Sequence, residues 1–301
     1  GWPTVRAAML LAATHGWESR QVDFTNAFLQ SDQPADQPLY MEMPQYYRPV
    51  GYEDRDVVLR MKKSIYGQVN SPLLFYEHLC VGMDKLGFEP SAADPCLFIH
   101  KEHQIMVLNY CDDQLWISPD NALIEEYVTK LKDLKYDLTL EPRGDTFGAG
   151  SLFGFLGINF NRKGSTIELT QTGLINKVIT YTGMDDATTR DTPAATAPLG
   201  TDKDGDPFEE EWSYPAAVGM LLYISSNTRP DIQFAVHQVC RFSHCPKRSH
   251  GQAVKRIIRY LIETRTKGIE FVPDLKEGLN AYVDADFAGL YGYENDQDPV
   301  S

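Results

Sequence analysis

The pattern of apolar and polar positions divides the chain into amphipathic helices and short strands. Apolar residues recur at helical spacing in residues 4–15, 72–86, 121–134, 174–182, 214–226, 232–242 and 252–264. Short runs rich in Ile, Val, Leu and Phe predict strands at residues 57–61, 96–100, 105–109, 115–118, 153–160 and 166–169. Strands and helices that share one antiparallel sheet indicate an α+β fold.

One predicted hairpin, in residues 104–118, carries adjacent acids at its tip. Apolar runs flank Asp112 and Asp113, and Tyr110 lies two residues before the first of them. An Asp-Asp pair can form a turn without further purpose, because aspartate tolerates turn conformations. The complete Tyr-x-Asp-Asp pattern is rarer in a chain of this size and favours a functional tip.

Carboxylates on rigid backbone are the ligands that hard divalent cations prefer, and two such ions can assist phosphoryl transfer. A hairpin tip supplies only part of such a site, so a neighbouring strand must supply another acid. Asp23 is the candidate, because apolar residues flank it where a predicted strand ends. Taken alone, Asp23 is more often a helix cap or a solvated acid. Together with the tip, it predicts that Asp23, Asp112 and Asp113 converge.

Composition narrows the class of protein. The 301 residues suffice for two domains or one large one, and 43% hydrophobic content supports a substantial core. No apolar run approaches the roughly 18 residues of a membrane span, and no signal-peptide layout opens the chain, so we expect an intracellular protein without membrane partners. Five cysteines without Cys-x-x-Cys spacing argue against a disulfide framework or a zinc site, and we expect buried thiols.

The net charge of −14 is unusual for a protein that binds nucleic acid. Many acids gather in residues 202–211, within a predicted loop or linker at 186–211. Basic residues gather instead in residues 247–267, on the polar side of a predicted helix. That side is either a solvated helix face or a surface for phosphate contacts.

Several motifs, in their order along the chain, resemble those of reverse transcriptases from copia-type long-terminal-repeat retrotransposons, and the resemblance covers nearly the whole sequence. The motifs are Gln21-Val22-Asp23, Ala27-Phe28-Leu29, Tyr40-Met41, Ser64-Ile65-Tyr66-Gly67, Ser71-Pro72, Asp94-Pro95-Cys96-Leu97-Phe98, Tyr110-Cys111-Asp112-Asp113, Phe155-Leu156-Gly157-Ile158, Thr228-Arg229-Pro230-Asp231-Ile232 and Tyr282-Val283-Asp284-Ala285-Asp286.

The resemblance implies three regions. Residues 1–170 are expected to form a polymerase palm with partial fingers, built on an antiparallel sheet with packed helices. Residues 171–272 are expected to form a helical thumb or connection region. Residues 273–301 resemble the truncated start of an α/β ribonuclease H domain, with Asp284 as its first carboxylate or simply as a strand-end acid. One aspartate cannot assemble a two-metal site, so we expect no ribonuclease H activity here.

The resemblance also implies an RNA-directed DNA polymerase that uses two Mg²⁺ ions, with Mn²⁺ as an alternative, held by Asp23, Asp112 and Asp113. Its implied partners are an RNA or DNA template with a primer, dNTPs, an upstream integrase and a downstream ribonuclease H. The implied location is cytoplasmic, within element-derived particles, or nuclear. Implied nucleotide contacts are Phe24, Phe28, Tyr66, Gly67 and Tyr110, with Phe28 excluding the 2′-hydroxyl. Candidate nucleic-acid contacts are Lys62, Lys63, Lys255, Arg256 and Arg259.

Some positions depart from the family pattern. Gln68-Val69-Asn70 and Leu73 stand where the family usually carries Leu-Lys-Gln and an arginine, so two basic contacts are missing. The basic fingers segment that precedes the first helix in the family is also absent from this sequence. We therefore expect weak activity from these 301 residues alone. The alternative is an inactive or co-opted element fragment that keeps the palm fold and weak nucleic-acid binding.

Overall fold

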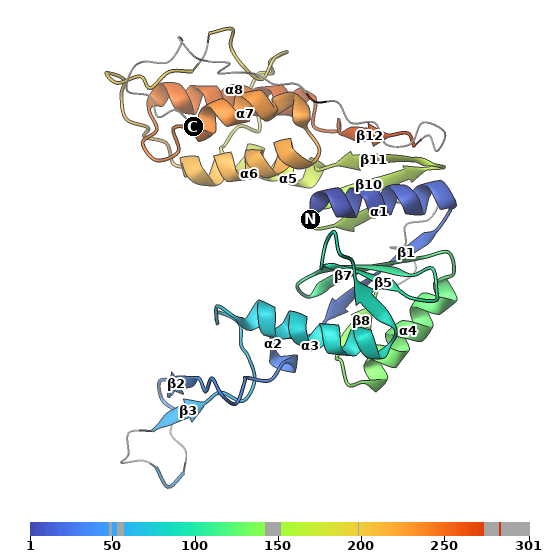
Figure 1. Ribbon diagram of the computed structural model, residues 1–301. Coiled ribbons are helices and arrows are strands. Elements are labelled where there is room, and N and C mark those ends of the chain that lie inside the picture. Colours follow the sequence, from blue (N-terminus) through green and yellow to red (C-terminus); the bar gives the residue numbers. More distant parts are fainter. Residues whose placement is uncertain (48–49, 53–56, 142–151, 198, 274–282, 284–301) are drawn as a thin grey trace. The chain divides into compact units, whose positions relative to one another are not determined.

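The computed structural model describes residues 1–47, 50–52, 57–141, 152–197, 199–273 and 283 (Figure 1). The chain forms two compact units, Gly1–Ala149 and Gly150–Ser301. This division comes earlier than the boundary after residue 170 that the sequence suggested. The reason is strand pairing, because the strands at 152–170 pair with one another and with a strand at 269–271.

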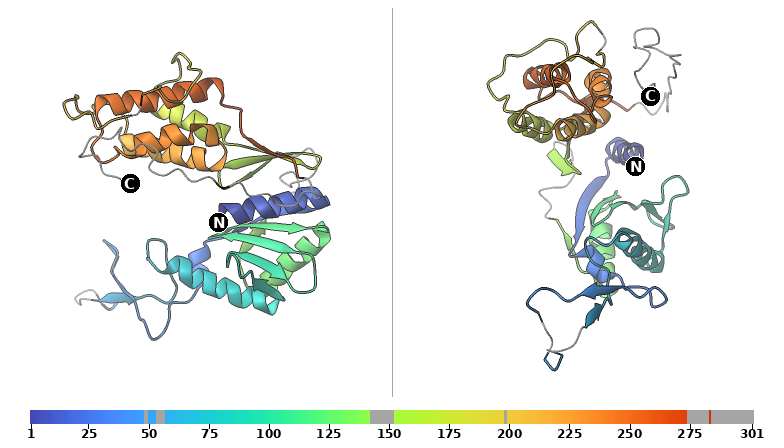
Figure 2. Two further views of the ribbon diagram at one scale, coloured as in Figure 1. Left: turned by 45° about the horizontal axis from the view of Figure 1, so that its top comes forward. Right: turned by 90° about the vertical axis from the view of Figure 1, so that its left-hand side faces the viewer.

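The first unit is built on a six-stranded antiparallel sheet. Its strands, in spatial order, are β4 (Phe88–Pro90), β5 (Leu97–His100), β6 (Met106–Tyr110), β7 (Asp113–Ser118), β1 (Glu18–Phe24) and β8 (Leu138–Leu140). Figure 1 and the left view of Figure 2 show α1 (Trp2–His15) on one side of this sheet. They show α3 (Ser71–Lys85) and α4 (Asn121–Asp133) on the other side.

Successive side chains of β7 point to opposite faces of the sheet, and all of them except that of Asp113 are buried. Both faces of the sheet must therefore be covered. Trp116 belongs to the apolar core that α3 and α4 form with the sheet. Leu115 and Ile117 point to the opposite face of the sheet. Helix α1 covers that face, and most of the buried residues of α1 are alanines. The central strands are therefore held in place from both sides.

Two shorter elements extend the first unit beyond the sheet. The short helix α2 (Ala27–Gln30) follows β1 after a two-residue turn. Strands β2 (Tyr40–Glu42) and β3 (Val58–Arg60) pair in a separate antiparallel ribbon that is largely exposed (Figure 1).

The second unit combines a four-stranded antiparallel sheet with a group of helices. The sheet contains β12 (Ile269–Phe271), β11 (Thr166–Thr170), β10 (Ile158–Lys163) and β9 (Leu152–Phe155) in that order. The helices are α5 (Thr172–Tyr181), α6 (Tyr214–Asn227), η2 (Pro230–Ile232), α7 (Gln233–Cys240) and α8 (Arg248–Glu263), and their apolar faces share one core.

A buried arginine ties α6 and η2 to the end of α8. Arg229 is 1% exposed and binds both carboxylate oxygens of Asp231, at 2.9 and 2.7 Å. It also donates to the backbone oxygen and hydroxyl of Thr264, each at 2.7 Å. Tyr260 donates to the same Asp231 carboxylate at 2.7 Å. The Thr228-Arg229-Pro230-Asp231 motif is thus a structural lock between helices.

The expected mixture of helices and antiparallel sheets is confirmed, whereas the thumb and ribonuclease H assignments stay predictions. The single strand predicted at 153–160 is wrong: β9 and β10 flank a tight turn at Leu156 and Gly157, whose φ angles are 50° and 74°. Both residues adopt the left-handed conformation that two-residue hairpin loops of one common type require. The predicted strand with Asp284 lies outside the described residues.

The expectation of buried thiols is also wrong. The five cysteines are free, and Cys96, Cys111 and Cys245 are exposed because they lie in loops and turns rather than on packed faces. Among the helices that the structure describes, none is both long and apolar enough to cross a membrane.

Candidate active site

Strand register brings two of the predicted acids face to face. Asp23 on β1 lies directly opposite Asp113 on β7, and Asp113 lies opposite Tyr110 on β6. Directly opposed residues of antiparallel strands point to the same face, with Cβ atoms about 4.5–5.5 Å apart. Tyr110, Asp113 and Asp23 therefore form one row across three strands, and all three side chains are exposed.

Asp112 adjoins this row from the hairpin tip. The tip consists of Cys111 and Asp112, one residue earlier than the Asp-Asp turn that the sequence suggested. Cys111 has φ 54°, an uncommon left-handed conformation for a residue other than glycine. The backbone oxygen of Asp112 accepts a hydrogen bond of 3.1 Å from the amide of Phe24. Asp112 is thereby tied to the residue next to Asp23.

The two neighbouring carboxylates affect the titration of Asp113. Desolvation of its carboxyl by the surrounding chain raises the pKa of Asp113, and the negative charges of Asp112 and Asp23 raise that pKa further. Within the described ranges, no lysine, arginine or histidine forms an ion pair with any of the three. Uncompensated carboxylates on rigid strands have the donor chemistry that suits a hard divalent cation.

The carboxylates are neighbours without forming a closed ligand set. In the part of the chain that the structure describes, no group of three or more His, Cys, Asp or Glu side chains is arranged to hold a metal ion. The side chains thus fit a cation by charge and chemistry, and would have to turn toward it.

A buried polar pair supports the hairpin from behind. Asn109 and Gln114 are opposite one another, one position away from Tyr110 and Asp113, and therefore point to the other face. Gln114 is 0% exposed and donates to Asn109 Oδ1 at 3.0 Å, while Trp116 Nε1 donates to Gln114 Oε1 at 2.9 Å. Sliding the strands would leave these amides unpaired in the core, which resists any change of register.

The sequence interpretation missed this pair. Two amide side chains within otherwise apolar strands, one on each side of Tyr-x-Asp-Asp, are the signal that could have revealed it.

A second side chain fixes the turn after Asp23. Gln30 donates to the backbone oxygens of Thr25 and Asp137, at 2.8 and 2.7 Å. Its Oε1 accepts from the amide of Asp137 at 2.9 Å. The end of β1 is thus attached to the segment that begins β8.

The predicted nucleotide contacts separate into two groups. Phe24 is 2% exposed, and its ring lies edge-on to Phe75 at 5.3 Å. It is a core residue, because β1 alternation points it away from the Asp23 face, and its assignment to a nucleotide pocket is corrected. Phe28 is half-buried, and its ring lies 4.7 Å from the exposed ring of Tyr66. Gly67, with φ 92°, adjoins Tyr66 beside a hollow that reaches β2.

The predicted basic contacts differ in whether an acidic side chain pairs with them. Lys63 forms an ion pair of 2.7 Å with Asp32 and holds the pKa of Asp32 below its usual value. Lys255 is paired with Glu210 at 2.6 Å. Lys62 is exposed, and neither it nor Arg256 or Arg259 pairs with an acid in the described ranges.

Comparison with known proteins points in one direction. The family model described as reverse transcriptase (RNA-dependent DNA polymerase) matches residues 2–196. The chain is 32% identical over 291 residues to the Retrovirus-related Pol polyprotein from transposon RE1 of Arabidopsis thaliana, covering 95% of this chain and 19% of that protein. It is 31% identical over 298 residues to the Retrovirus-related Pol polyprotein from transposon TNT 1-94 of Nicotiana tabacum, covering 95% and 21%.

A shorter relative matches over most of its own length. The chain is 25% identical over 276 residues to a putative transposon Ty5-1 protein of Saccharomyces cerevisiae, covering 90% of this chain and 84% of that protein. The chain spans only about a fifth of the RE1 and TNT 1-94 polyproteins.

Proposed function

We infer, because the chain belongs to the reverse transcriptase family of copia-type retrotransposon polyproteins, that it carries the nucleotidyl-transfer site of an RNA-directed DNA polymerase. The observation that carries this proposal is the pairing of Asp23 with Asp113 across adjacent strands, with Asp112 beside them at the hairpin tip. The substrates would be dNTPs and the 3′-hydroxyl of a primer on an RNA or DNA template.

In this proposal, Asp23, Asp112 and Asp113 hold two divalent ions, Mg²⁺ or alternatively Mn²⁺. The bound ions would neutralise the triphosphate and lower the pKa of the attacking hydroxyl. The chain contributes positioning: the β1–β7 register keeps two carboxylates opposed, and the buried Asn109–Gln114 pair holds that register. Rigid placement of this kind is the main way in which proteins assist phosphoryl transfer.

Phe28, Tyr66 and Gly67 would form the neighbouring nucleotide surface. Phe28 lies on α2, which follows the strand that carries Asp23, and the exposed ring of Tyr66 packs against it. Ser64 supports this arrangement by donating to the backbone oxygen of Phe28 at 2.5 Å. The aromatic pair is therefore attached to the same backbone segment as the acids.

Two observations favour the alternative, an inactive or co-opted element fragment. A polymerase also needs cations that grip the triphosphate. Of the two adjacent lysines near Tyr66, Lys63 is already paired with Asp32. The family's basic residues are replaced at Gln68–Asn70 and Leu73.

Primer extension on an RNA template tests the proposal. We expect residues 1–301 to bind Mg²⁺ but to give at most trace synthesis, because Lys63 is paired with Asp32 and the family's basic residues are replaced at Gln68–Asn70 and Leu73. A polypeptide extended at its N-terminus by a basic fingers segment should synthesise DNA, and the Asp112→Asn, Asp113→Asn double variant of it should not. If the extended polypeptide is equally inactive, the alternative holds; robust synthesis by residues 1–301 would show that Lys62 or another internal cation grips the triphosphate.

Sugar discrimination tests the role of Phe28. In the active extended polypeptide, Phe28→Ala should admit rNTPs, because the barrier to a 2′-hydroxyl is steric. The ratio of kcat/KM for dNTP to that for rNTP is expected to fall on the order of tenfold or more. Leu29→Ala, a truncation at the adjacent exposed position, is the matched control. An unchanged ratio for Phe28→Ala would leave Phe28 as a packing residue only.

We also propose that the 301 residues function within a larger polyprotein, because they span only about a fifth of the RE1 and TNT 1-94 Pol polyproteins. By the resemblance of the motifs to the copia-type family, an integrase would precede them and a ribonuclease H would begin near Asp284.

A further inference from the structure

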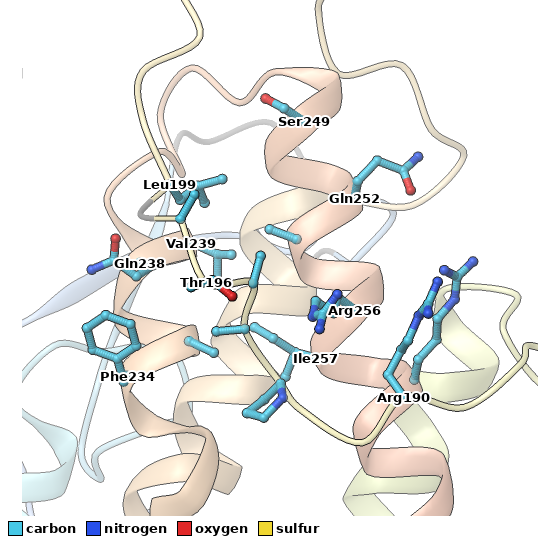
Figure 3. A pocket seen from close by; sticks show the side chains of 17 residues that line it. Arg190, Thr196, Leu199, Phe234, Gln238, Val239, Ser249, Gln252, Arg256 and Ile257 are labelled. Atoms are coloured by element: carbon cyan, nitrogen blue, oxygen red, sulfur yellow. The ribbon is translucent and has the colours of Figure 1, made fainter. Parts of the chain in front are cut away.

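The second unit contains a cavity that has no part in the carboxylate site. It measures about 370 Å³ and lies between α7, α8 and the segment formed by residues 190–197 and 199 (Figure 3). Small apolar side chains from all three make up much of its wall, among them Ala194, Val239 and Ile257. This volume falls within the usual range for small-molecule sites of about 300–1,000 Å³.

Three arginines line this cavity. They are Arg190 from the segment before α6 and Arg256 and Arg259 from α8. Within the described ranges, none of the three forms an ion pair with a carboxylate. The cations of the same helix that do not line the cavity behave differently, because Lys255 pairs with Glu210 and Arg248 with Asp206. The acidic 202–211 segment therefore neutralises α8 outside the cavity and leaves the cavity itself positive.

The guanidinium groups also have unused donors. Arg256 donates to Thr192 Oγ1 at 2.7 Å through one terminal nitrogen. Its Nε and the Nε of Arg259 are buried without a hydrogen-bond partner in the described structure. A buried N–H without an acceptor is unfavourable, and a bound anion would remove that cost. The planar fork of arginine matches the oxygens of phosphate in a bidentate arrangement.

The opposite side of the cavity has a different character. Figure 3 shows Phe234 and Gln238, both from α7, on one side and Arg190 and Arg256 on the other. Gln238 is 5% exposed, yet both polar atoms of its amide are without a partner in the described structure. Phe234 is 59% exposed, which is unusual for a phenylalanine. A buried amide with a free donor and acceptor beside an open aromatic ring suits the edge and face of a nucleobase.

We propose that this cavity binds a nucleotide, with its phosphate on Arg190, Arg256 and Arg259 and its base against Phe234 and Gln238. The nucleotide is either free or the 5′-phosphorylated end of a strand, since the two share this chemistry. None of the residues that line this cavity belongs to the carboxylate set, and the proposal does not depend on that set. The net charge of −14 does not prevent such binding, because exposed charges more than about 8 Å away are largely screened at physiological salt.

The test is fluorescence anisotropy with residues 1–301 and a 3′-labelled oligodeoxynucleotide, with and without a 5′-phosphate. EDTA is present throughout, so that the outcome does not depend on the metal-dependent site. We expect the phosphorylated strand to bind about tenfold or more tightly, since a charge-assisted pair is at stake. Competition with dAMP and with inorganic phosphate distinguishes the sources: displacement by dAMP at low concentration assigns a free nucleotide, and its failure assigns a strand end.

Arg256→Gln with Arg259→Gln should abolish the preference for the 5′-phosphate. Lys163→Gln, at a lysine of the same unit that pairs with Glu168 and does not line the cavity, should leave it intact. Thermal melts of each variant report folding. Gln238→Leu adds a second readout, because removing an unpaired buried amide should stabilise the fold while weakening nucleotide binding. No preference in the unmodified chain, an unchanged preference in the double arginine variant, or unchanged affinity in Gln238→Leu would overturn the proposal.

Discussion

Primer extension by the active extended polypeptide is expected to fall about 10³-fold or more when Asp113 is replaced by asparagine. Asparagine keeps the size and the β-strand position of Asp113 but removes the negative charge that stands opposite Asp23. The same loss is expected for Asp23→Asn. Single-turnover rates with saturating dNTP, together with Mn²⁺ binding followed by electron paramagnetic resonance, measure both consequences.

Stability separates this effect from simple unfolding. Because the pKa of Asp113 is raised, the folded chain holds this proton to higher pH than the unfolded chain. Ionisation of Asp113 therefore opposes folding once the pH rises above the unfolded value near 3.9. Without metal at neutral pH, Asp113→Asn should melt at the same temperature as the unmodified chain or slightly higher.

Asp133→Asn, an exposed acid at the end of α4, is the matched control and should change neither rate nor metal binding. Near-normal extension by Asp113→Asn would remove Asp113 from the proposed chemistry.

Replacing Arg229 by alanine is expected to destabilise the second unit by about 3–5 kcal/mol. The substitution leaves a cavity and removes two hydrogen bonds to Asp231 in η2 and two to Thr264 at the end of α8. Arg229→Lys should recover only part of this loss, because an ammonium cannot reproduce the bidentate contact with Asp231. Urea unfolding followed by circular dichroism measures the difference.

Lys163→Ala is the control for this measurement, since it breaks an exposed pair with Glu168 in the same unit. Its cost should stay below about 1 kcal/mol. Equal costs for the two variants would contradict the structural role of the Arg229 lock.

The contribution of the Arg229–Asp231 pair to the stability of the fold depends on pH. Partial burial pushes the pKa of Asp231 upward, but hydrogen bonds from Arg229 and Tyr260 and the charge of Arg229 outweigh it, so the pKa is lowered. The contribution to stability is thus fully present above the unfolded value near 3.9 and is lost as the pH falls through the lower folded value.

The sequence by itself determined the local elements and the candidate acids. Helical periodicity alone located α4 and α8 to within a few residues, because the apolar residues of an amphipathic helix recur at helical spacing along its buried face. The β6–β7 hairpin followed equally from two apolar runs around a short polar tip. The motifs around Asp23 and Asp112 were sufficient to nominate a shared site, because their residue types specify the chemistry.

Only the tertiary structure decided which side chains meet. The β1–β7 register places Asp23 against Asp113, and the same alternation sends Phe24 into the core instead of toward a nucleotide. A one-residue slip would exchange those two roles, and no local pattern reports a pairing between strands so far apart in the chain. Likewise, the basic residues of α8 looked alike in the sequence. A long-range ion pair with Glu210 neutralises Lys255, whereas Arg256 and Arg259 line a cavity and have no carboxylate partner among the described residues.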